Sequence, residues 1–392
     1  MVIILVFFII LLTCGILEQF NHLKRLTKIP VRIQVNGTRG KSTTTRLIAA
    51  GLREAGFKVL AKTTGTLPRL ILEDGSEIPI QRRGKANINE QMRIFKEAVK
   101  RKVNVLVLEC MAVNPELQWV SEHKIIKSTI GVITNIREDH IEDIGPGLNK
   151  MAQVLKLTIP QKGILVTTEK EYFNTLKEEA DKLKTKIIQV NPEDISDKLI
   201  QQFNYMNFKE NISLALQVNK LLGVEEKSAL QGMLKANPDP GALKIYKLTK
   251  GIQNILFVNA FAANDIKSTL IILENIKKRM ELNNCPKIGI INNREDRVHR
   301  TIQFAHLLAK ENDFFDKIIL LGPLSKLAVR TLLKFRVSLD KIFNLENEAE
   351  VEKIIHLVIT HIDNKVCLIG LGNTKGMGQA LIDYFDQFGE VI

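Results

Sequence analysis

The sequence contains the stretch Asn36-Gly37-Thr38-Arg39-Gly40-Lys41-Ser42-Thr43 near its beginning. An apolar, β-branched run at 31–35 precedes it, and a helix-like run at 44–56 follows it. A strand, a glycine-rich turn and a helix N-terminus in this order form a cradle for phosphate, because backbone N–H groups and the helix dipole point to one place. The stretch therefore predicts a phosphate-binding loop in an α/β domain.

Two side chains of this loop suit a nucleoside triphosphate and its metal ion. Lys41 would neutralise the outer phosphates, and the Ser42 hydroxyl would ligate Mg²⁺. Val35 stands where the common form of the loop has a glycine, so the motif is a variant. A plain glycine turn capped by Ser or Thr is the alternative interpretation, but Gly-Lys-Ser-Thr directly after a strand favours nucleotide binding.

Length and charge limit the class of protein. A chain of 392 residues is long enough for two domains with separate cores. The net charge of +13 suits a nucleotide, an acidic substrate or an anionic membrane surface. Nucleic acid is disfavoured, because the chain has one Trp and four Tyr and shows no nucleic-acid-binding module. The four cysteines form no Cys-x-x-Cys pair, which argues against a zinc site or a disulfide framework and indicates a reducing compartment.

The first 17 residues carry no charge and are almost wholly apolar. As a helix they would just cross a thin hydrocarbon core, which predicts a transmembrane anchor over residues 1–23. A signal peptide would need basic residues before the apolar stretch, whereas Lys24, Arg25 and Lys28 come after it. The positive-inside rule then predicts a single-pass protein of the cell membrane with a cytoplasmic body.

Strand-like and helix-like runs alternate along the rest of the chain, which predicts an α/β fold with mostly parallel sheets. The segment Asn237-Pro238-Asp239-Pro240-Gly241 is typical of a break between domains. We therefore predict a central ATP-binding domain at 30–240 and a smaller C-terminal Rossmann-like α/β domain at 241–392. Residues 69–81 predict a hairpin. The expected strands are 32–35, 58–61, 104–108, 130–134, 164–167, 186–190, 255–259, 287–292, 317–321 and 365–369.

Polar residues follow two of the expected strands in the first half. Glu109 ends the buried run 103–108, and beside a phosphate loop it is expected to hold Mg²⁺ rather than merely face solvent. The run 131–136 leads into Arg137-Glu138-Asp139-His140-Ile141-Glu142-Asp143. One histidine among four carboxylates predicts a second, more tolerant cation site at His140. Lys156, on the next helix, is either an ordinary solvated lysine or a charge near the outer phosphate.

Two strand ends in the second half carry weaker signals. Small residues, an aromatic and Asn264 follow 255–259 and suit an adenine pocket. Asp296 and Arg297 follow 287–292, and the planar fork of Arg297 could reach phosphate. The glycine-rich segment 370–378 does not have the dinucleotide-binding spacing and predicts a tight strand-to-helix turn.

Taken in order, these motifs resemble the ATP-dependent Mur ligase superfamily, and more closely its poly-γ-glutamate synthase family. The resemblance spans nearly the whole chain, including the N-terminal anchor. Besides the phosphate loop, it is carried by the blocks Lys62-Thr63-Thr64-Gly65-Thr66, Glu109-Cys110-Met111-Ala112-Val113-Asn114-Pro115, Glu138-Asp139-His140, Pro238-Asp239-Pro240-Gly241-Ala242, Phe261-Ala262-Ala263-Asn264-Asp265 and Asp296-Arg297-Val298-His299-Arg300-Thr301.

The resemblance implies a role for each matching residue. Ser42 and Glu109 would hold one Mg²⁺ and His140 would help to hold a second, with Mn²⁺ as an alternative metal. Lys41, Glu109, His140 and Arg297 would be the catalytic residues. ATP would be bound by Gly37, Thr38, Arg39, Gly40, Lys41, Ser42, Thr43, Asn264 and Asp296.

Two features depart from the Mur ligase pattern. Mur ligases have a His and a Pro in the block that matches 261–265, and both are absent here. Many of them also use a carbamylated lysine after the Asp-His block, and Lys156 lies about one residue away from that position. The departures concern the contacts to the nucleotide and leave the phosphate loop intact.

The implied activity is an ATP-dependent amide ligase that activates a glutamate or polyglutamate carboxylate as an acyl phosphate and joins it to the amine of a glutamate. The implied partners are the polymer, the membrane, a small multispanning membrane subunit and an export subunit. Two alternatives stay open: a membrane-anchored nucleotide switch or transport ATPase that makes no bond, and another oligoglutamate ligase with a different acceptor.

Overall fold

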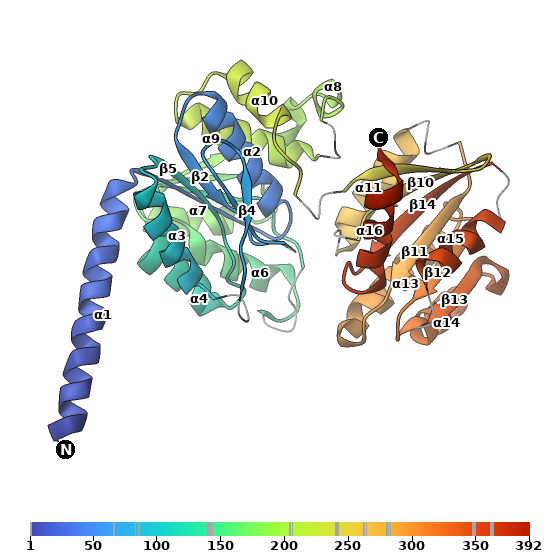
Figure 1. Ribbon diagram of the computed structural model, residues 1–392, viewed down its shortest axis with the longest axis horizontal. Helices are drawn as coiled ribbons and strands as arrows, with labels where there is room; N and C mark the ends of the chain where they lie inside the picture. Colours follow the sequence, from blue (N-terminus) through green and yellow to red (C-terminus); the bar gives the residue numbers. More distant parts are fainter. Residues whose placement is uncertain are drawn as a thin grey trace. The chain divides into compact units, whose positions relative to one another are not determined.

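The computed structural model describes residues 2–65, 67–82, 84, 87–138, 144–203, 205, 207–239, 243–261, 263, 265–279, 282, 284–346, 350–360 and 364–392 (Figure 1). The chain divides into two compact units. One comprises Met1–Phe203 and Asn207–Pro240, and the other comprises Asn204–Met206 and Gly241–Ile392. Each unit is built on a mainly parallel sheet with helices on its faces, as the α/β prediction requires.

The sheet of the first unit has the strand order β4-β3-β2-β5-β1-β6-β7-β8 in the described residues. The six strands from β2 to β8 in this order are parallel, and β3 and β4 add an antiparallel hairpin at one edge, as predicted for 69–81. The strands are β1 (Val31–Asn36), β2 (Val59–Lys62), β3 (Arg69–Ile71), β4 (Glu77–Pro79), β5 (Val105–Glu109), β6 (Ile130–Ile133), β7 (Ile164–Thr167) and β8 (Lys186–Gln189).

Helices cover both faces of this sheet because successive parallel strands are added first toward one edge and then toward the other. Among the parallel strands, the step from β1 to β2 runs one way and the steps from β2 to β5 and on to β6, β7 and β8 run the other way. Right-handed crossovers therefore place α2 on one face and α3, α4, α6 and α7 on the other. Helices α9 and α10 pack against α2. The helices are α2 (Lys41–Glu54), α3 (Asn89–Lys100), α4 (Pro115–Val120), the π-helix η1 (Ser121–Ile126), α6 (Leu148–Leu155), η2 (Lys156–Thr158), α7 (Phe173–Lys182), η3 (Pro192–Asp194), α8 (Asp197–Ile200), α9 (Lys209–Leu221) and α10 (Glu226–Leu234).

The sheet of the second unit has the order β13-β12-β11-β14-β10-β9-β15 in the described residues. The strands from β13 to β10 are parallel, and β9 and β15 are antiparallel additions at one edge. Its strands are β9 (Ile245–Lys250), β10 (Gln253–Asn259), β11 (Lys287–Asn292), β12 (Lys317–Leu321), β13 (Ile342–Glu346), β14 (Lys365–Gly372) and β15 (Glu390–Val391). Its helices are α11 (Ile266–Lys278), η4 (Glu295–Arg297), α13 (Val298–Lys310), α14 (Ser325–Lys334), η5 (Leu339–Lys341), α15 (Val351–Thr360) and α16 (Met377–Phe388).

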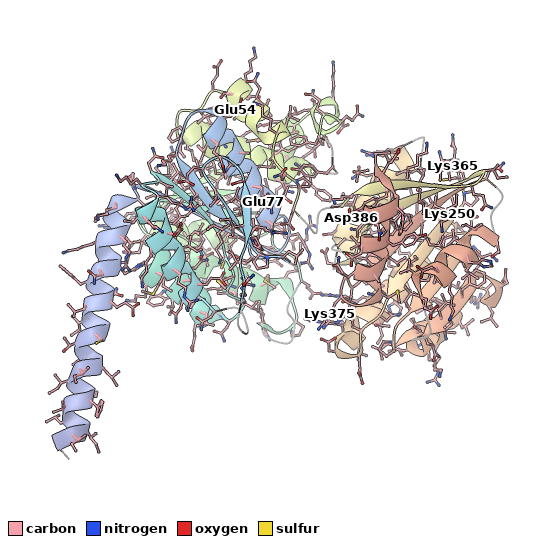
Figure 2. All side chains as sticks on the ribbon, viewed as in Figure 1. Glu54, Glu77, Lys250, Lys365, Lys375 and Asp386 are labelled. Atoms are coloured by element: carbon pink, nitrogen blue, oxygen red, sulfur yellow. The ribbon has the colours of Figure 1, made fainter. Side chains whose placement is uncertain are left out.

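The core of the second unit lies between the sheet and helices α15 and α16. Phe385 of α16 stacks on Phe257 of β10, with ring centroids 4.4 Å apart. The hydroxyl of Tyr246 donates to Asp386 of α16 at 2.8 Å, which satisfies the polar end of this buried ring (Asp386 is labelled in Figure 2). These contacts attach the antiparallel strand β9, which the sequence analysis did not predict, to the rest of the unit.

Helix α1 (Val2–Lys28) begins the first unit. Among the described residues, one helix is long and apolar enough to cross a membrane, and it is this one, over Ile3–Lys28. Its large apolar side chains from Ile3 to Leu17 are exposed, whereas its last turns pack on the domain. The ring of His22 lies edge-on against Phe95 of α3, and its Nε2 is 2.7 Å from the carbonyl oxygen of Ile125. The apolar helix therefore continues into the hydrophobic core of the first unit.

The π-helix η1, next to the end of α1, contains a buried carboxylate. Glu122 is 1% exposed and accepts hydrogen bonds from the backbone N–H and the hydroxyl of Ser128, at 2.8 and 2.9 Å. Burial disfavours the charged form and raises the pKa of Glu122 to about 7, although the bonds from Ser128 oppose the shift. The folded protein therefore holds this proton at pH values where the unfolded chain has lost it.

The variant Glu122→Gln is expected to change how stability depends on pH. Because the pKa of Glu122 is raised on folding, the wild-type protein loses stability as pH rises from about 4.5 to about 7. Glutamine mimics the protonated form, so the variant should gain up to about 3 kcal/mol over wild type between pH 5 and pH 8. Denaturant unfolding of the full chain in detergent measures this difference. Parallel curves for wild type and variant would contradict it, and the exposed Glu116→Gln is the control.

Candidate active site

Three neighbouring parallel strands end at the same edge of the first sheet. Strand β1 leads into the phosphate loop, β5 ends at Glu109, and β6 leads into Thr134 and Asn135. The strand order β5-β1-β6 places these three ends next to one another. Parallel sheets bind ligands at this edge, where the direction of the crossovers reverses. The topology thus brings together residues that are about 100 positions apart in the sequence.

The loop after β6 holds the phosphate loop in shape. The N–H of Thr38 donates to the carbonyl oxygen of Asn135 (3.0 Å), and the N–H of Arg39 donates to Asn135 Oδ1 (3.0 Å). The Thr134 hydroxyl and the Asn135 amide both donate to the carbonyl oxygen of Arg39, at 2.7 and 3.1 Å. A loop whose carbonyls are bonded from behind can keep other N–H groups directed at an anion. The sequence analysis included Thr134 and Asn135 in the strand-like run 131–136 but gave them no role.

The two glycines of the loop are required by close contacts. Gly37 has φ +125°, and a Cβ there would lie 2.1 Å from Thr134 Oγ1. Gly40 has φ +82°, and a Cβ there would lie 2.2 Å from Oδ1 of Asn211, which is on α9. Positive φ and lack of space both exclude a side chain at these positions. Gly40 also caps α2, so the same residue ends the loop and starts the helix.

The N-terminus of α2 is directed at the proposed phosphate site. The first turn of α2, which the structure describes in full, has no acidic residue. No side chain of that turn therefore neutralises the positive end of the helix dipole. Lys41 Nζ donates to the carbonyl oxygens of Gly37 and Thr38, at 2.7 and 3.1 Å. Thr43 lies in the same turn and is partly buried. The ammonium group of Lys41 is thus held within the loop, where a phosphate could replace the carbonyl oxygens as its partner.

Ser42 and Glu109 meet, as the metal prediction requires. The Ser42 hydroxyl donates to Glu109 Oε2 at 2.8 Å, and the N–H of Thr64 donates to the same oxygen at 2.7 Å. A hydroxyl and a carboxylate are the oxygen ligands that Mg²⁺ prefers, so this pair fits the ion. His140 lies outside the described residues. Within the described residues no group of three His, Cys, Asp or Glu side chains is arranged to hold a metal.

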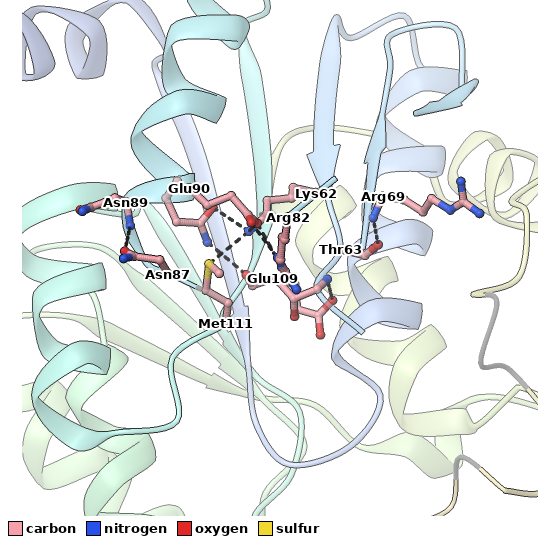
Figure 3. A network of polar contacts seen from close by, with 11 residues as sticks. Lys62, Thr63, Arg69, Arg82, Asn87, Asn89, Glu90, Glu109 and Met111 are labelled. Atoms are coloured by element: carbon pink, nitrogen blue, oxygen red, sulfur yellow. Dashed lines mark hydrogen bonds and ion pairs between the residues drawn. The ribbon is translucent and has the colours of Figure 1, made fainter. Parts of the chain in front are cut away.

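A buried lysine supports Glu109 from behind (Figure 3). Lys62, at the end of β2, is fully buried, and its Nζ lies 2.7 Å from Glu90 and 3.3 Å from the side-chain oxygen of Gln91. Gln91 donates in turn to the backbone oxygen of Glu109 at 3.3 Å, and Arg82 forms a two-bonded ion pair with Glu90. Burial lowers the pKa of Lys62, and the neighbouring Glu90 opposes that shift. Sequence reasoning quoted Lys62 but could not find this support, because its partners lie on other elements.

The candidates of the second unit lie at the carboxyl end of its sheet. Asp296 and Arg297 form the short helix η4 after β11, and Asp296 pairs with Arg294 through two bonds of 2.9 and 2.7 Å. Asn264 lies outside the described residues. The glycine-rich segment forms the predicted strand-to-helix turn between β14 and α16, and Asn292 donates to the carbonyl oxygens of Asn373 and Lys375 there. A role of Asp296 and Arg297 at the phosphate loop stays a prediction.

Known proteins share the sequence of both units. The family model of the Mur ligase middle domain matches residues 35–237, and that of the poly-gamma-glutamate synthase CapB C-terminal domain matches residues 245–388. PGA synthase CapB of Bacillus subtilis is 40% identical over 97% of this chain and 96% of that protein. The chain belongs to the CapB family of poly-γ-glutamate synthases. The capsule biosynthesis protein CapB of Bacillus anthracis is also 40% identical, over 96% of this chain and 80% of that protein.

Solved structures share the fold of this CapB-family chain. One is a bifunctional folylpolyglutamate synthase/dihydrofolate synthase of Yersinia pestis, complexed with AMPPNP and a Mn ion. Its TM-score is 0.64 at 15% identity, over 94% of this chain and 92% of that chain. The Mur-ligase-like fold is thereby confirmed.

Lys156 was expected about one residue away from the position of the carbamylated lysine of many Mur ligases. It lies in η2, and its Nζ is 3.3 Å from Glu179 of α7. An ion pair with a carboxylate accounts for its placement without carbamylation.

Comparing Gly40→Ala with Gly223→Ala should separate the effect of positive φ from the effect of the close contact between Gly40 and Asn211. Both glycines have similar φ, +82° and +78°, but a Cβ at Gly223 would have open space. Both variants should lose about 1–2 kcal/mol of stability from backbone strain. Only Gly40→Ala should also weaken ATP binding, by roughly ten- to a hundredfold, because displacing one N–H from a phosphate costs about 1.5–3 kcal/mol. Titration with a fluorescent ATP analogue measures the affinity, and equal affinities would contradict the close contact.

Proposed function

We propose that this chain is the ATP-dependent amide ligase of poly-γ-glutamate synthesis, joining glutamate units through acyl phosphates. The observation that carries the proposal is the preformed phosphate loop with the Ser42–Glu109 pair beside it, in a chain of the CapB family. A folylpolyglutamate synthase of the same fold was solved with AMPPNP and Mn, which supports ATP as substrate and Mg²⁺ or Mn²⁺ as the metal.

Different residues of the first unit are proposed to contact the phosphates of ATP and its metal ion. The N–H groups of Gly37 and of residues 40–43, at the N-terminus of α2, hold the phosphates, while those of Thr38 and Arg39 stay bonded to Asn135. Lys41 exchanges its bonds to the carbonyl oxygens of Gly37 and Thr38 for bonds to the outer phosphates. Ser42 and Glu109 would hold the divalent ion, which would supply positive charge to the transferring phosphoryl group. His140 is proposed to contribute to a second ion.

The chemistry follows from this arrangement in two steps. A carboxylate oxygen of the glutamate or polyglutamate substrate attacks the γ-phosphorus, the bond to the bridging oxygen breaks, and ADP leaves. The amine of the next glutamate then attacks the acyl carbon, loses a proton, and expels inorganic phosphate to give the amide. Negative charge accumulates on the phosphoryl oxygens in the first step, so cations such as Lys41 and Arg297 lower its barrier. Exclusion of water protects the acyl phosphate between the steps.

The second unit is proposed to complete the nucleotide site. Arg297 would contact the phosphates and Asn264 the adenine, with Asp296 beside them. Both residues of η4 follow the carboxyl end of β11, the edge at which such sheets bind ligands.

The apolar helix α1 is proposed to anchor the enzyme in the cell membrane as a single span, with its body in the cytoplasm, where ATP is available. A basic surface suits an anionic polymer. The proposed partners are the growing polymer, a small multispanning membrane subunit and an export subunit that would receive the product.

Turnover should depend on glutamate and pass through an acyl phosphate. The full-length protein with ATP and Mg²⁺ should release ADP only when glutamate or its polymer is present, and hydroxylamine should trap an acyl hydroxamate. Separate reactions with D-glutamate and with L-glutamate, each analysed for the adduct by mass spectrometry, identify which enantiomer is the substrate. ATP turnover that a membrane partner drives without glutamate, and without a trapped adduct, would instead indicate a switch or a transport ATPase.

The variant Lys41→Ala should lose turnover by about a hundred- to a thousandfold and keep its fold, because the lysine stabilises charge that develops in the transition state. Lys58→Ala is the matched control, since this exposed lysine precedes β2 at the opposite end of the parallel strands. ADP release measures activity and circular dichroism checks folding. Full activity of Lys41→Ala would remove the phosphate loop from the mechanism.

A further inference from the structure

The last segment of the first unit runs back along the helix that starts at the phosphate loop. Helix α10 packs tightly on α2, since a Cβ on Gly232 would lie 2.4 Å from the carbonyl oxygen of Ala50. After α10, Lys235 pairs with Glu54 at the C-terminal end of α2 (2.7 Å). Four residues later, Asp239 lies 3.5 Å from Arg46, two turns closer to the start of α2. Residues 235–239 therefore lead the chain toward the phosphate loop.

Arg46 holds this segment from inside the protein. Its side chain is 2% exposed, and its fork donates to both oxygens of Glu77 on β4, at 2.5 and 3.0 Å. The side chain of Asn237 also donates to Glu77, at 3.4 Å (Figure 2 labels Glu54 and Glu77). One buried guanidinium thus ties together α2, the β3–β4 hairpin and the segment that ends at Asp239.

The carboxylate of Asp239 reaches the metal-binding side of the loop. A Cβ placed on Gly65 would lie 3.1 Å from Ser42 Oγ and 3.4 Å from Asp239 Oδ2. The two oxygens thus flank the same small space, and Ser42 is bonded to Glu109 on its other side. Gly65 leaves room between the hydroxyl of the phosphate loop and Asp239, which lies one residue before the end of the first unit.

We propose that Asp239 is a positioning residue: its ion pair with Arg46 fixes the start of the linker to the second unit beside the phosphate loop. The proposal rests on the proposed function, because that function needs residues of the second unit at the nucleotide. A linker whose start is held by Arg46, near Ser42, limits where the acceptor glutamate can meet the acyl phosphate. Without the tether the nucleotide still binds, but amine and acyl carbon are aligned less often.

The arrangement predicts that the tether can be cut without unfolding the protein. Removing the carboxylate of Asp239 leaves Arg46 with both oxygens of Glu77, so no buried charge is left without a partner. The neighbouring pair of Lys235 and Glu54 makes a matched control. It joins the same segment to the same helix, but Lys235 is 68% exposed, and exposed pairs contribute little.

The test compares Asp239→Asn with Lys235→Met in the full-length protein. In Asp239→Asn, the affinity for a fluorescent ATP analogue should stay within about twofold of wild type, while kcat/KM for glutamate should fall by about ten- to a hundredfold. Amide hydrogen exchange of residues 235–239 should become faster. Lys235→Met should behave as wild type in all three measurements.

Two results would overturn the proposal. One is wild-type glutamate kinetics and exchange in Asp239→Asn. The other is a loss of ATP affinity as large as the loss of ligation, which would make Asp239 part of the nucleotide site. If the wild-type protein itself shows no glutamate-dependent ADP release, the proposed function fails, and faster exchange confined to Asp239→Asn still shows the tether.

Discussion

The structure of the first unit depends on how the backbone of the phosphate loop is held. A loop that binds an anion must direct its N–H groups outward, which leaves its carbonyl groups to be satisfied from behind. Here Thr134 and Asn135, at the end of the neighbouring strand β6, donate to the carbonyl oxygen of Arg39. The side chain of Thr134 fills the space at Gly37, and Asn211 fills the space at Gly40. The loop is therefore shaped by the protein before a nucleotide arrives.

Buried charges connect this loop to its surroundings. Lys62 and Arg46 are both almost fully buried, and each is paired with carboxylates: Lys62 with Glu90, and Arg46 with Glu77 and Asp239. A buried ion pair adds little net stability, but removing one partner is costly, so such pairs hold elements in one arrangement. Lys62 supports the strand end that carries Glu109, the proposed metal ligand, and Arg46 supports the segment that ends at Asp239. The pair of Lys62 joins the end of β2 to α3, and the pair of Arg46 with Glu77 joins α2 to strand β4 of the adjoining hairpin.

The C-terminal end of the apolar helix α1 is packed into the first unit. His22 and Leu26 are buried against α3 and η1, so the exposed part of α1 extends from the domain as a continuous helix. A helix joined in this way transmits its orientation to the domain more firmly than a flexible linker would. In the proposed membrane-anchored enzyme, such an attachment would keep the site at a defined distance from the lipid surface.

Features whose residues are contiguous in the chain could be predicted from the sequence. The strand–loop–helix order of 31–56, the apolar run of α1 and the buried run ending at Glu109 each carry their signal locally. Which elements contact one another could be seen only in the tertiary structure. Asn211 faces Gly40, and Asp239 reaches Arg46, across long stretches of chain, because strand order and helix packing bring them together. The strands β9 and β13 escaped prediction because they lie next to and at an edge of their sheet, are partly exposed, and lack the continuous apolar runs of the central strands.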